Sequence, residues 1–171
     1  MLDSSVIDNR ETQQAQSRAR KKFGLIGLGF ISDRHRKAIK DTNNDLWVAC
    51  DIEETKRHKL FDPENIGMDP PVAFEKKYQD LKKHDIDCVS ICTPNHLHKS
   101  MCDCFQDKTV ICEKPLFLNS EECDEVNGNI NVVQQLRYDK GLQKEITDII
   151  ENAVFCDVQL RINVCRGEWY F

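Results

Sequence analysis

The stretch FGLIGLGFIS, residues 23–32, decides the fold of this chain. A short apolar run, Phe23 to Ile26, leads straight into a turn that contains Gly27 and Gly29. In a G-x-G-x-x-G turn, the first glycine permits the tight bend and the second lets the backbone approach a pyrophosphate. Ser32 stands in the last place, and a helix that begins there would present free N–H groups to the anion. The loop residues Gly27, Gly29, Phe30 and Ile31 are therefore the predicted dinucleotide contacts.

A carboxylate follows the next apolar run, Leu46 to Cys50. Asp51 lies about 20 residues after the glycine loop, where a carboxylate that binds a ribose diol is expected. It favours NAD over NADP, because it would repel a 2′-phosphate, although Arg57 could still reach such a phosphate. The alternative is a glycine turn that only packs a strand against a helix.

Three more apolar runs follow, and segments with helical spacing separate them. The runs cover residues 88–92 and 109–112, and a weaker one opens at Val132. Helices are predicted for residues 74–84, 97–105, 119–127 and 141–151, and Asn119 with Glu122 forms a capping pair. Strands that alternate with helices predict an α/β fold with a Rossmann-like, doubly wound parallel sheet.

The segment CDVQLRINVC, residues 156–165, alternates apolar and polar side chains. This period of two predicts a strand with one solvated face, the first of an antiparallel sheet in a second domain. We therefore expect a mobile tail over residues 1–22, a dinucleotide-binding domain over 23–138, and the start of an incomplete substrate or dimerisation domain over 139–171. One such strand cannot bury its apolar face. Either the chain stops inside a domain, or the strand pairs with a second copy or a complementing chain.

Composition narrows the classes of partner. The 171 residues carry a net charge of -5 and no apolar run of membrane-spanning length, which argues against nucleic acid and membrane partners. Residues 1–22 lack the apolar core of a signal peptide. Nine cysteines without a signal peptide suggest the reducing cytoplasm, and several of them are expected to be buried: Cys50, Cys88, Cys92 and Cys112.

A charged pair stands where the fourth apolar run ends, in the segment VICEKPLF, residues 110–117. Ligands of parallel sheets bind outside the carboxyl ends of the strands, so this segment, the segment CTPNHLH at 92–98 and the glycine loop should line one crevice. There, Lys114 would bond a sugar hydroxyl and stabilise the alkoxide that forms as hydride leaves. Pro115 would fix the backbone, and a cis bond is one way to do so. The alternative is a solvated surface lysine after an edge strand.

Three motifs, FGLIGLGFISDRHRKAI, CVSICTPNHLHKS and VICEKPL, resemble the N-terminal domain of the Gfo/Idh/MocA oxidoreductase family in order and spacing. Together with QLRY and RGEWY they most resemble dehydrogenases that oxidise C3 of UDP-N-acetylglucosaminuronic acid. The resemblance implies NAD, a Rossmann domain and a UDP-sugar substrate. It makes Lys114 the catalytic lysine and gives Glu113 a role in orienting the cofactor. It places Thr93, Asn95 and His98 on the nicotinamide side, and Arg166, Trp169, Tyr170 and Lys114 beside the substrate.

The chain also departs from the family pattern. Only one strand of the second domain is present, and the later HxxD motif that carries the catalytic histidine has no counterpart. The helix after EKPL is short. We therefore expect a fragment, a decayed copy or a compact descendant, with weak or no turnover as the bare chain. A catalytically inactive NAD-binding or interaction module is the alternative function.

A metal site is the third interpretation. His96, His98, Cys102 and Cys104 form H-x-H-x3-C-x-C, but the spacing is not that of a zinc knuckle and no second pair exists. No metal is therefore predicted. His35 and His58 lie among basic residues and are expected in solvent.

Overall fold

The computed structural model describes residues 19–61 and 72–152. The chain divides into two compact units, residues 1–133 and 134–171. The division falls before the boundary at residue 138 that the sequence predicts. The strand predicted within residues 156–165 lies outside the described residues.

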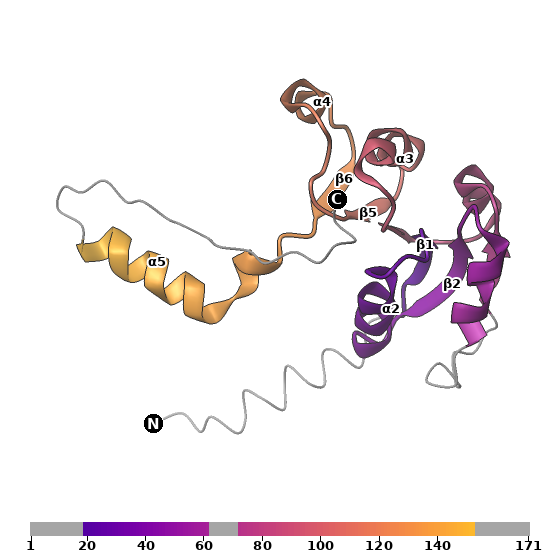
Figure 1. Ribbon diagram of the computed structural model, residues 1–171, viewed down its shortest axis with the longest axis horizontal. Coiled ribbons are helices and arrows are strands. Elements are labelled where there is room, and N and C mark those ends of the chain that lie inside the picture. Colours follow the sequence, from indigo (N-terminus) through magenta and orange to yellow (C-terminus); the bar gives the residue numbers. More distant parts are fainter. Residues whose placement is uncertain (1–18, 62–71, 153–171) are drawn as a thin grey trace. The chain divides into compact units, whose positions relative to one another are not determined.

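The first unit is built on a parallel sheet of six strands in the order β3-β2-β1-β4-β5-β6, part of which is labelled in Figure 1. The order reverses direction between β1 and β4, which is the arrangement of a doubly wound Rossmann sheet. The predicted fold is thus confirmed. The strands are β1 (Lys22–Ile26), β2 (Asp45–Cys50), β3 (Ala73–Glu75), β4 (Cys88–Ile91), β5 (Thr109–Cys112) and β6 (Asn129–Val132).

Helices cover both faces of this sheet, and α2 (Ser32–Asp41) and α3 (His98–Cys104) lie on opposite sides of it (Figure 1). One core cluster joins Met101 and Phe105 to strand residues such as Val48 and Val89. The other joins Ile39 of α2 to Leu25 and its neighbours. Alternate residues of the strands enter alternate cores, so the central strands are buried on both faces and read as continuous apolar runs. The other helices among the described residues of this unit are η1 (Glu54–Phe61), η3 (Tyr78–Lys83), η4 (Asn95–Leu97) and α4 (Ser120–Asp124).

The helix predicted for residues 74–84 is wrong. Phe74 lies in β3 and pairs with Ala49 of β2, and only a 3-10 helix over Tyr78–Lys83 follows. Leu81 is fully buried, so the apolar spacing that suggested one helix comes from two elements in succession. Pairing with the edge of β2 outweighs the local helical pattern, as tertiary contacts often do for short segments.

Two boundaries also differ from the prediction. The tail does not extend to residue 22, because Arg20 forms an ion pair with Asp45 at 2.5 Å and the Lys22 N–H donates to Asp87 at 2.9 Å. The last strand ends at Val132 instead of opening there. The capping pair is confirmed: Glu122 accepts the Asn119 N–H at 3.4 Å, at the start of α4.

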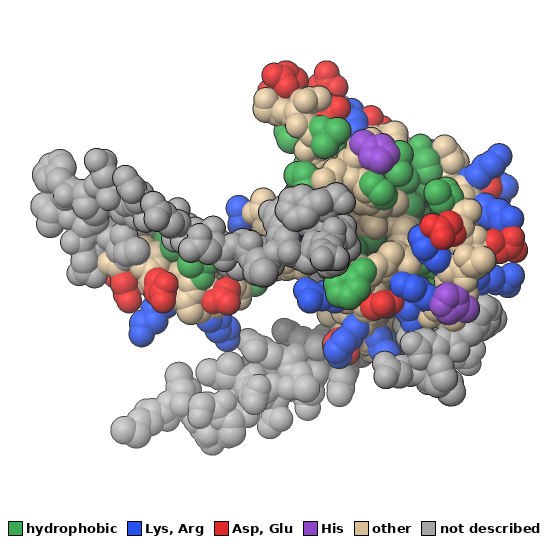
Figure 2. Space-filling model, in the orientation of Figure 1, with side chains coloured by type: hydrophobic (Ala, Val, Ile, Leu, Met, Phe, Trp, Pro, Cys, Tyr) green, Lys and Arg blue, Asp and Glu red, His purple; other side chains and the backbone are tan. Residues whose placement is uncertain are grey.

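The second unit contains two described helices, the 3-10 turn η5 (Gln135–Tyr138) and α5 (Lys140–Asn152). The α5 helix agrees with the helix predicted for residues 141–151. Its first turn is closed by Asp139, which accepts the Leu142 N–H at 2.9 Å. Within the described part of the chain, no helix is long and apolar enough to cross a membrane. On the face shown in Figure 2, charged side chains of both signs are interspersed among the described residues and form no basic stripe there.

Candidate functional site

A cavity of about 770 Å³ opens at the carboxyl ends of β1, β2 and β4. Its size is within the roughly 300–1,000 Å³ that is typical of small-molecule and cofactor sites. It lies where the strand order reverses, which is the position at which open parallel sheets bind ligands. The residues that line it come from these strand ends, from the segment after β3, and from η1, η3, η4 and α3: Ile26, Gly27, Gly29, Cys50, Asp51, Ile52, Glu53, Lys56, Lys76, Lys77, Tyr78, Gln79, Cys92, Thr93, Pro94, His96, Leu97 and Met101.

The two glycines of the loop have different surroundings. Gly27 has a φ of +88°, and a Cβ there would lie 2.8 Å from the carbonyl oxygen of Cys92. Gly29 has no atom within 4 Å of its Cβ position, so space for a ligand is open beside it. The hydroxyl of Ser32, in place of the third glycine, donates to the Gly29 carbonyl at 2.5 Å. Gly27 therefore makes the turn, and Gly29 allows a ligand to approach the backbone.

Asp51 is held in one orientation by the backbone around it. It is 7% exposed; Oδ2 accepts the Leu28 N–H at 2.7 Å and Oδ1 accepts the Glu53 N–H at 2.9 Å. Lys56 lies 3.6 Å from Oδ1 and 2.8 Å from Glu53. A carboxylate has about four acceptor positions, so Asp51 retains capacity for ribose hydroxyls. Asp51, the residue predicted to bind the ribose, is thus hydrogen-bonded directly to the glycine loop.

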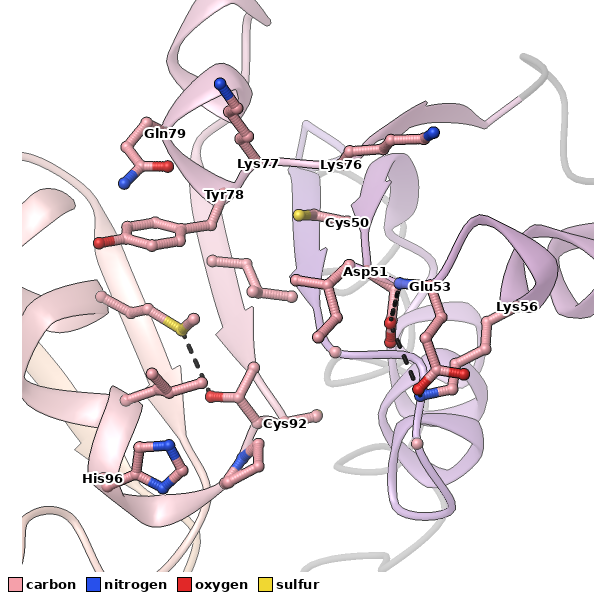
Figure 3. A pocket seen from close by; sticks show the side chains of 18 residues that line it. Cys50, Asp51, Glu53, Lys56, Lys76, Lys77, Tyr78, Gln79, Cys92 and His96 are labelled. Carbon is pink, nitrogen blue, oxygen red and sulfur yellow. Dashed lines mark hydrogen bonds and ion pairs between the residues drawn. The ribbon is translucent and has the colours of Figure 1, made fainter.

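The opposite wall of the cavity was predicted only in part: His96 belongs to the predicted segment 92–98, whereas Tyr78 and Gln79 were not predicted. Figure 3 shows Tyr78, Gln79 and His96 on one side and Asp51, Glu53 and Lys56 on the other. Tyr78 and Gln79 follow β3, the strand that helical spacing concealed. The flat Tyr78 ring and the exposed Ile52 both line the cavity and offer apolar surface.

The predicted residues of the segment 92–98 separate into different environments. Thr93 lines the cavity, and its hydroxyl donates to the Met101 sulfur at 3.3 Å. Asn95 is exposed on η4 and does not line it. In the glycine loop, Phe30 is 75% exposed, whereas Ile31 packs against the core on the α2 side.

The prediction that His98 contacts the cofactor needs correction. The side chain is fully buried and presents no surface to a ligand. Its Nε2 lies 2.9 Å from the Thr93 carbonyl oxygen, and its Nδ1 lies 2.9 Å from that of Pro115. His98 therefore holds the loop after β4 against the loop after β5, which is a positioning role.

The charged pair after β5 has one buried and one exposed member. Lys114 is exposed, Glu113 is 7% exposed, and neither lines the cavity. The Lys114–Pro115 peptide bond is cis. Strand spacing places the end of β5 roughly 14 Å from the end of β2, so Lys114 and Asp51 stand at opposite ends of one edge. A crevice shared by all three predicted segments is therefore only partly formed: the cavity takes in residues of the glycine loop and of the segment 92–98, but none of the segment 110–117.

Glu113 is bound to a residue that was expected in solvent. His35 Nε2 lies 3.0 Å from Glu113 Oε1, and His35 Nδ1 lies 2.6 Å from Ser90 Oγ. The prediction for His35 is wrong because the residue precedes buried Ile39 by four positions, which places it on the inner face of α2. The four-residue spacing from Ile39 was the sequence signal that could have predicted the burial of His35. Burial alone would raise the pKa of Glu113, but His35 and Lys114 outweigh it and hold that pKa below its usual value.

The cysteines predicted to be buried are so: Cys50, Cys88, Cys92 and Cys112. Burial, with the nearby Asp51 carboxylate, raises the pKa of Cys50 to about 12, so the thiol stays protonated and unreactive near neutral pH. In the described ranges, no group of three His, Cys, Asp or Glu side chains is arranged to hold a metal ion. The predicted substrate residues Arg166, Trp169 and Tyr170 lie outside the described residues.

The cavity fits a dinucleotide. The open space beside Gly29 admits a pyrophosphate close to backbone N–H groups, and α2 begins at Ser32 immediately after. The orientated Asp51 carboxylate suits a ribose diol. Three lysines and two carboxylates line the cavity, so the charge of its walls is compatible with an anion.

The comparisons with known proteins agree with this geometry. Residues 21–130 match the profile of the GFO_IDH_MocA family, described as an oxidoreductase family with an NAD-binding Rossmann fold. The chain is 31% identical over 110 residues to an inositol 2-dehydrogenase/D-chiro-inositol 3-dehydrogenase of Lactiplantibacillus plantarum, covering 61% of this chain and 30% of the relative.

Solved structures show the same fold. The WlbA (WbpB) dehydrogenase of Thermus thermophilus, in complex with NAD and UDP-GlcNAcA, superposes with a TM-score of 0.68 at 24% identity, over 88% of this chain and 53% of that one. The WlbA dehydrogenase of Bordetella pertussis, in complex with NADH and UDP-GlcNAcA, gives 0.62 at 26% identity, over 78% and 42%.

The chain thus spans about a third of the length of the inositol dehydrogenase and about half of the WlbA structures. The family profile covers well over half of the chain itself, including the glycine loop, Asp51 and the Glu113–Lys114 pair. The chain belongs to the Gfo/Idh/MocA oxidoreductase family and contains its NAD-binding Rossmann domain.

Proposed function

We propose that the chain binds NAD across the carboxyl edge of its sheet and supplies the cofactor half and the lysine of a dehydrogenase that oxidises a UDP-N-acetylhexosaminuronic acid at C3. The observation that carries the cofactor part is the cavity itself, with Asp51 bonded to the Leu28 N–H and open space beside Gly29. The sugar part rests on the motif resemblance, and it agrees with WlbA dehydrogenases whose structures hold UDP-GlcNAcA.

Residues at different strand ends would have different roles in binding and catalysis. Asp51 would hold the ribose diol at the end of β2, and the backbone beside Gly29 would receive the pyrophosphate. A nicotinamide, when bound, supplies the acceptor for a hydride. Lys114, exposed at the end of β5, would donate a hydrogen bond to the hydroxyl that is oxidised and stabilise its developing negative charge. Among the described residues we assign none to accept the hydroxyl proton.

A second function, an NAD-binding module without turnover, is favoured by one observation. Lys114 does not line the cavity, so the described residues complete the Asp51 end of the edge but not the Lys114 end. Such a module would keep the glycine loop and Asp51 and would bind the cofactor without oxidising a sugar. The two functions therefore differ in turnover and agree in NAD binding.

The experiment combines binding with turnover on the purified chain. NAD affinity is measured by titration calorimetry, and NADH absorbance is followed with UDP-N-acetylglucosaminuronic acid and, separately, with myo-inositol. Binding with weak turnover of the UDP-sugar, lost in Lys114→Met, supports the dehydrogenase. Binding without turnover supports the module, and turnover of inositol alone would overturn the UDP-sugar substrate. Absence of NAD binding would contradict both functions.

A further inference from the structure

A buried polar cluster contains Glu113 and connects it to two other elements of the fold. His35 comes from α2, Ser90 from β4, and Glu113 follows β5. His35 Nδ1 lies 2.6 Å from Ser90 Oγ, and Nε2 lies 3.0 Å from Glu113 Oε1. The His35 and Glu113 side chains are each only 10% exposed. Such a contact is shielded from water, so its loss leaves a buried group without a partner.

The chemistry of the partners sets the direction of these hydrogen bonds. An ionised carboxylate only accepts, so the Nε2–H of His35 donates to Glu113. The Ser90 hydroxyl can donate or accept, and it therefore adapts to a neutral or a charged imidazole. The other oxygen of Glu113 accepts the backbone N–H of Lys114 at 3.3 Å. A continuous line of contacts thus runs from α2 to the backbone of the exposed lysine.

The charges around Glu113 explain why its carboxylate depends on His35 to keep its position. The groups that act on it electrostatically are His35 on α2 and Lys114 on its own turn, while its charge in turn acts on the thiols of Cys92 after β4 and Cys112 in β5. Both thiols are buried and remain protonated, because burial raises the pKa of Cys92, and the hydrogen bond with Cys102 together with burial raises the pKa of Cys112. Without His35, a nearly buried carboxylate would lose its side-chain hydrogen-bond donor and would turn outward or take up a proton.

We propose that His35 is a positioning residue for Lys114: it fixes the Glu113 carboxylate, and Glu113 fixes the backbone of the turn that carries the lysine. The α2 helix also begins at Ser32, directly after the glycine loop. The α2 helix therefore contacts both the glycine loop, which it directly follows, and the turn that carries Lys114, through His35 and Glu113. The consequence for turnover rests on the proposed function, whereas the positioning of the turn does not.

Two substitutions of His35 separate this role from a general structural one. The His35→Gln amide can keep a donor near the Nε2 position and hence the bond to Glu113, whereas His35→Asn keeps a polar group only near Ser90. The probe is the backbone amide resonance of Lys114 in a 15N-labelled chain. We expect it to stay in place in His35→Gln and to move in His35→Asn, with His58→Gln, at an exposed histidine, as control. An unchanged Lys114 resonance in folded His35→Asn would overturn the proposal.

A titration of the wild-type chain keeps the proposal testable if His35→Asn does not fold. As pH is lowered through the titration of Glu113, the Glu113 carboxyl carbon and the Lys114 amide should shift together, and a Lys114 amide that does not follow Glu113 would overturn the proposal. NADH fluorescence on the same samples separates the two hypotheses. A chain that shows the coupled resonances but no NADH binding contradicts the proposed function alone. A chain that binds NADH without the coupling contradicts only the role of His35.

Discussion

The two ends of the strand edge are built in different ways. At the β1–β2 end, the backbone itself positions the functional group, because the Leu28 and Glu53 N–H groups both donate to Asp51. At the β5 end, side chains hold the turn, through His35 and Glu113, and Lys114 remains exposed. The β1–β2 end lines the cavity. The β5 end lies outside the cavity and presents one reactive side chain, that of Lys114. Cofactor binding and hydride chemistry should therefore be separable by mutation.

The largest effect is expected at the β5 end. If turnover is detected, Lys114→Met should lower kcat by a factor of about 10² to 10³, because a charge-assisted hydrogen bond to the developing alkoxide is lost. The NAD dissociation constant should stay nearly the same, since Lys114 does not line the cavity. Steady-state kinetics and calorimetry on the same preparation check both halves. Lys37→Met, an exposed lysine paired with Asp41, is the matched control. Equal losses of affinity and turnover would show that the two ends do not act separately.

The next effect belongs to the glycine loop. Gly27→Ala should lower the free energy of unfolding by roughly 2–4 kcal/mol, because alanine is strained at positive φ and its Cβ would press on the Cys92 carbonyl. Gly29→Ala meets no atom within 4 Å, so it should leave stability unchanged and weaken NAD binding. Urea unfolding and NAD titration of the pair measure this difference. Similar stability losses in both variants would show that the two glycines do not have separate roles.

A smaller effect is expected from Asp51→Asn. Asparagine keeps one acceptor oxygen, so one of the two backbone N–H groups loses its partner, at a cost of about 1–3 kcal/mol. NAD affinity should fall in the same variant, whereas Asp124→Asn, at an exposed position outside the cavity, should change it little. Thermal unfolding and calorimetry test the two variants together. Unchanged NAD affinity in Asp51→Asn would remove the ribose role of this carboxylate.

The smallest effect is the pH dependence that Glu113 contributes. The pKa of Glu113 is lowered in the folded chain by His35 and Lys114, in spite of burial, so its ionised form stabilises the fold. That contribution is complete above the ordinary value of 4.5 and is lost as pH falls through the lower folded value. The stability difference between the wild type and Glu113→Gln should therefore shrink in acid. Denaturant unfolding across a pH series measures it, and a difference that stays constant would contradict the stabilisation of the ionised carboxylate by His35 and Lys114.

The sequence was sufficient for the parts of the fold that local patterns encode. The strand before Gly27, the run before Asp51 and the capping pair of Asn119 and Glu122 all have short-range signals that the structure confirms. Strand β3 was missed because three residues paired to an edge leave almost no period, and the apolar spacing of Phe74, Tyr78 and Leu81 imitates a helix.

In the candidate site, too, the sequence predicted the residues of local motifs but not the contacts between distant segments. Gly27, Gly29, Asp51 and Thr93 line the cavity as the motif order implies. The contacts of His35 with Ser90 and Glu113 join residues 55 and 78 positions apart, so no local pattern could pair them. His98 illustrates the reverse error, since a motif residue expected beside a ligand is instead fully buried between two loops.

The central claim is that the carboxyl edge of the sheet binds a dinucleotide through the glycine loop and Asp51. A calorimetric titration of the purified chain with NAD and, in parallel, with NADP tests it most directly. We predict saturable binding of NAD, weaker binding of NADP because Asp51 repels the 2′-phosphate, and loss of NAD affinity in Gly29→Ala. No heat of binding with NAD, or tighter binding of NADP than of NAD, would contradict the claim.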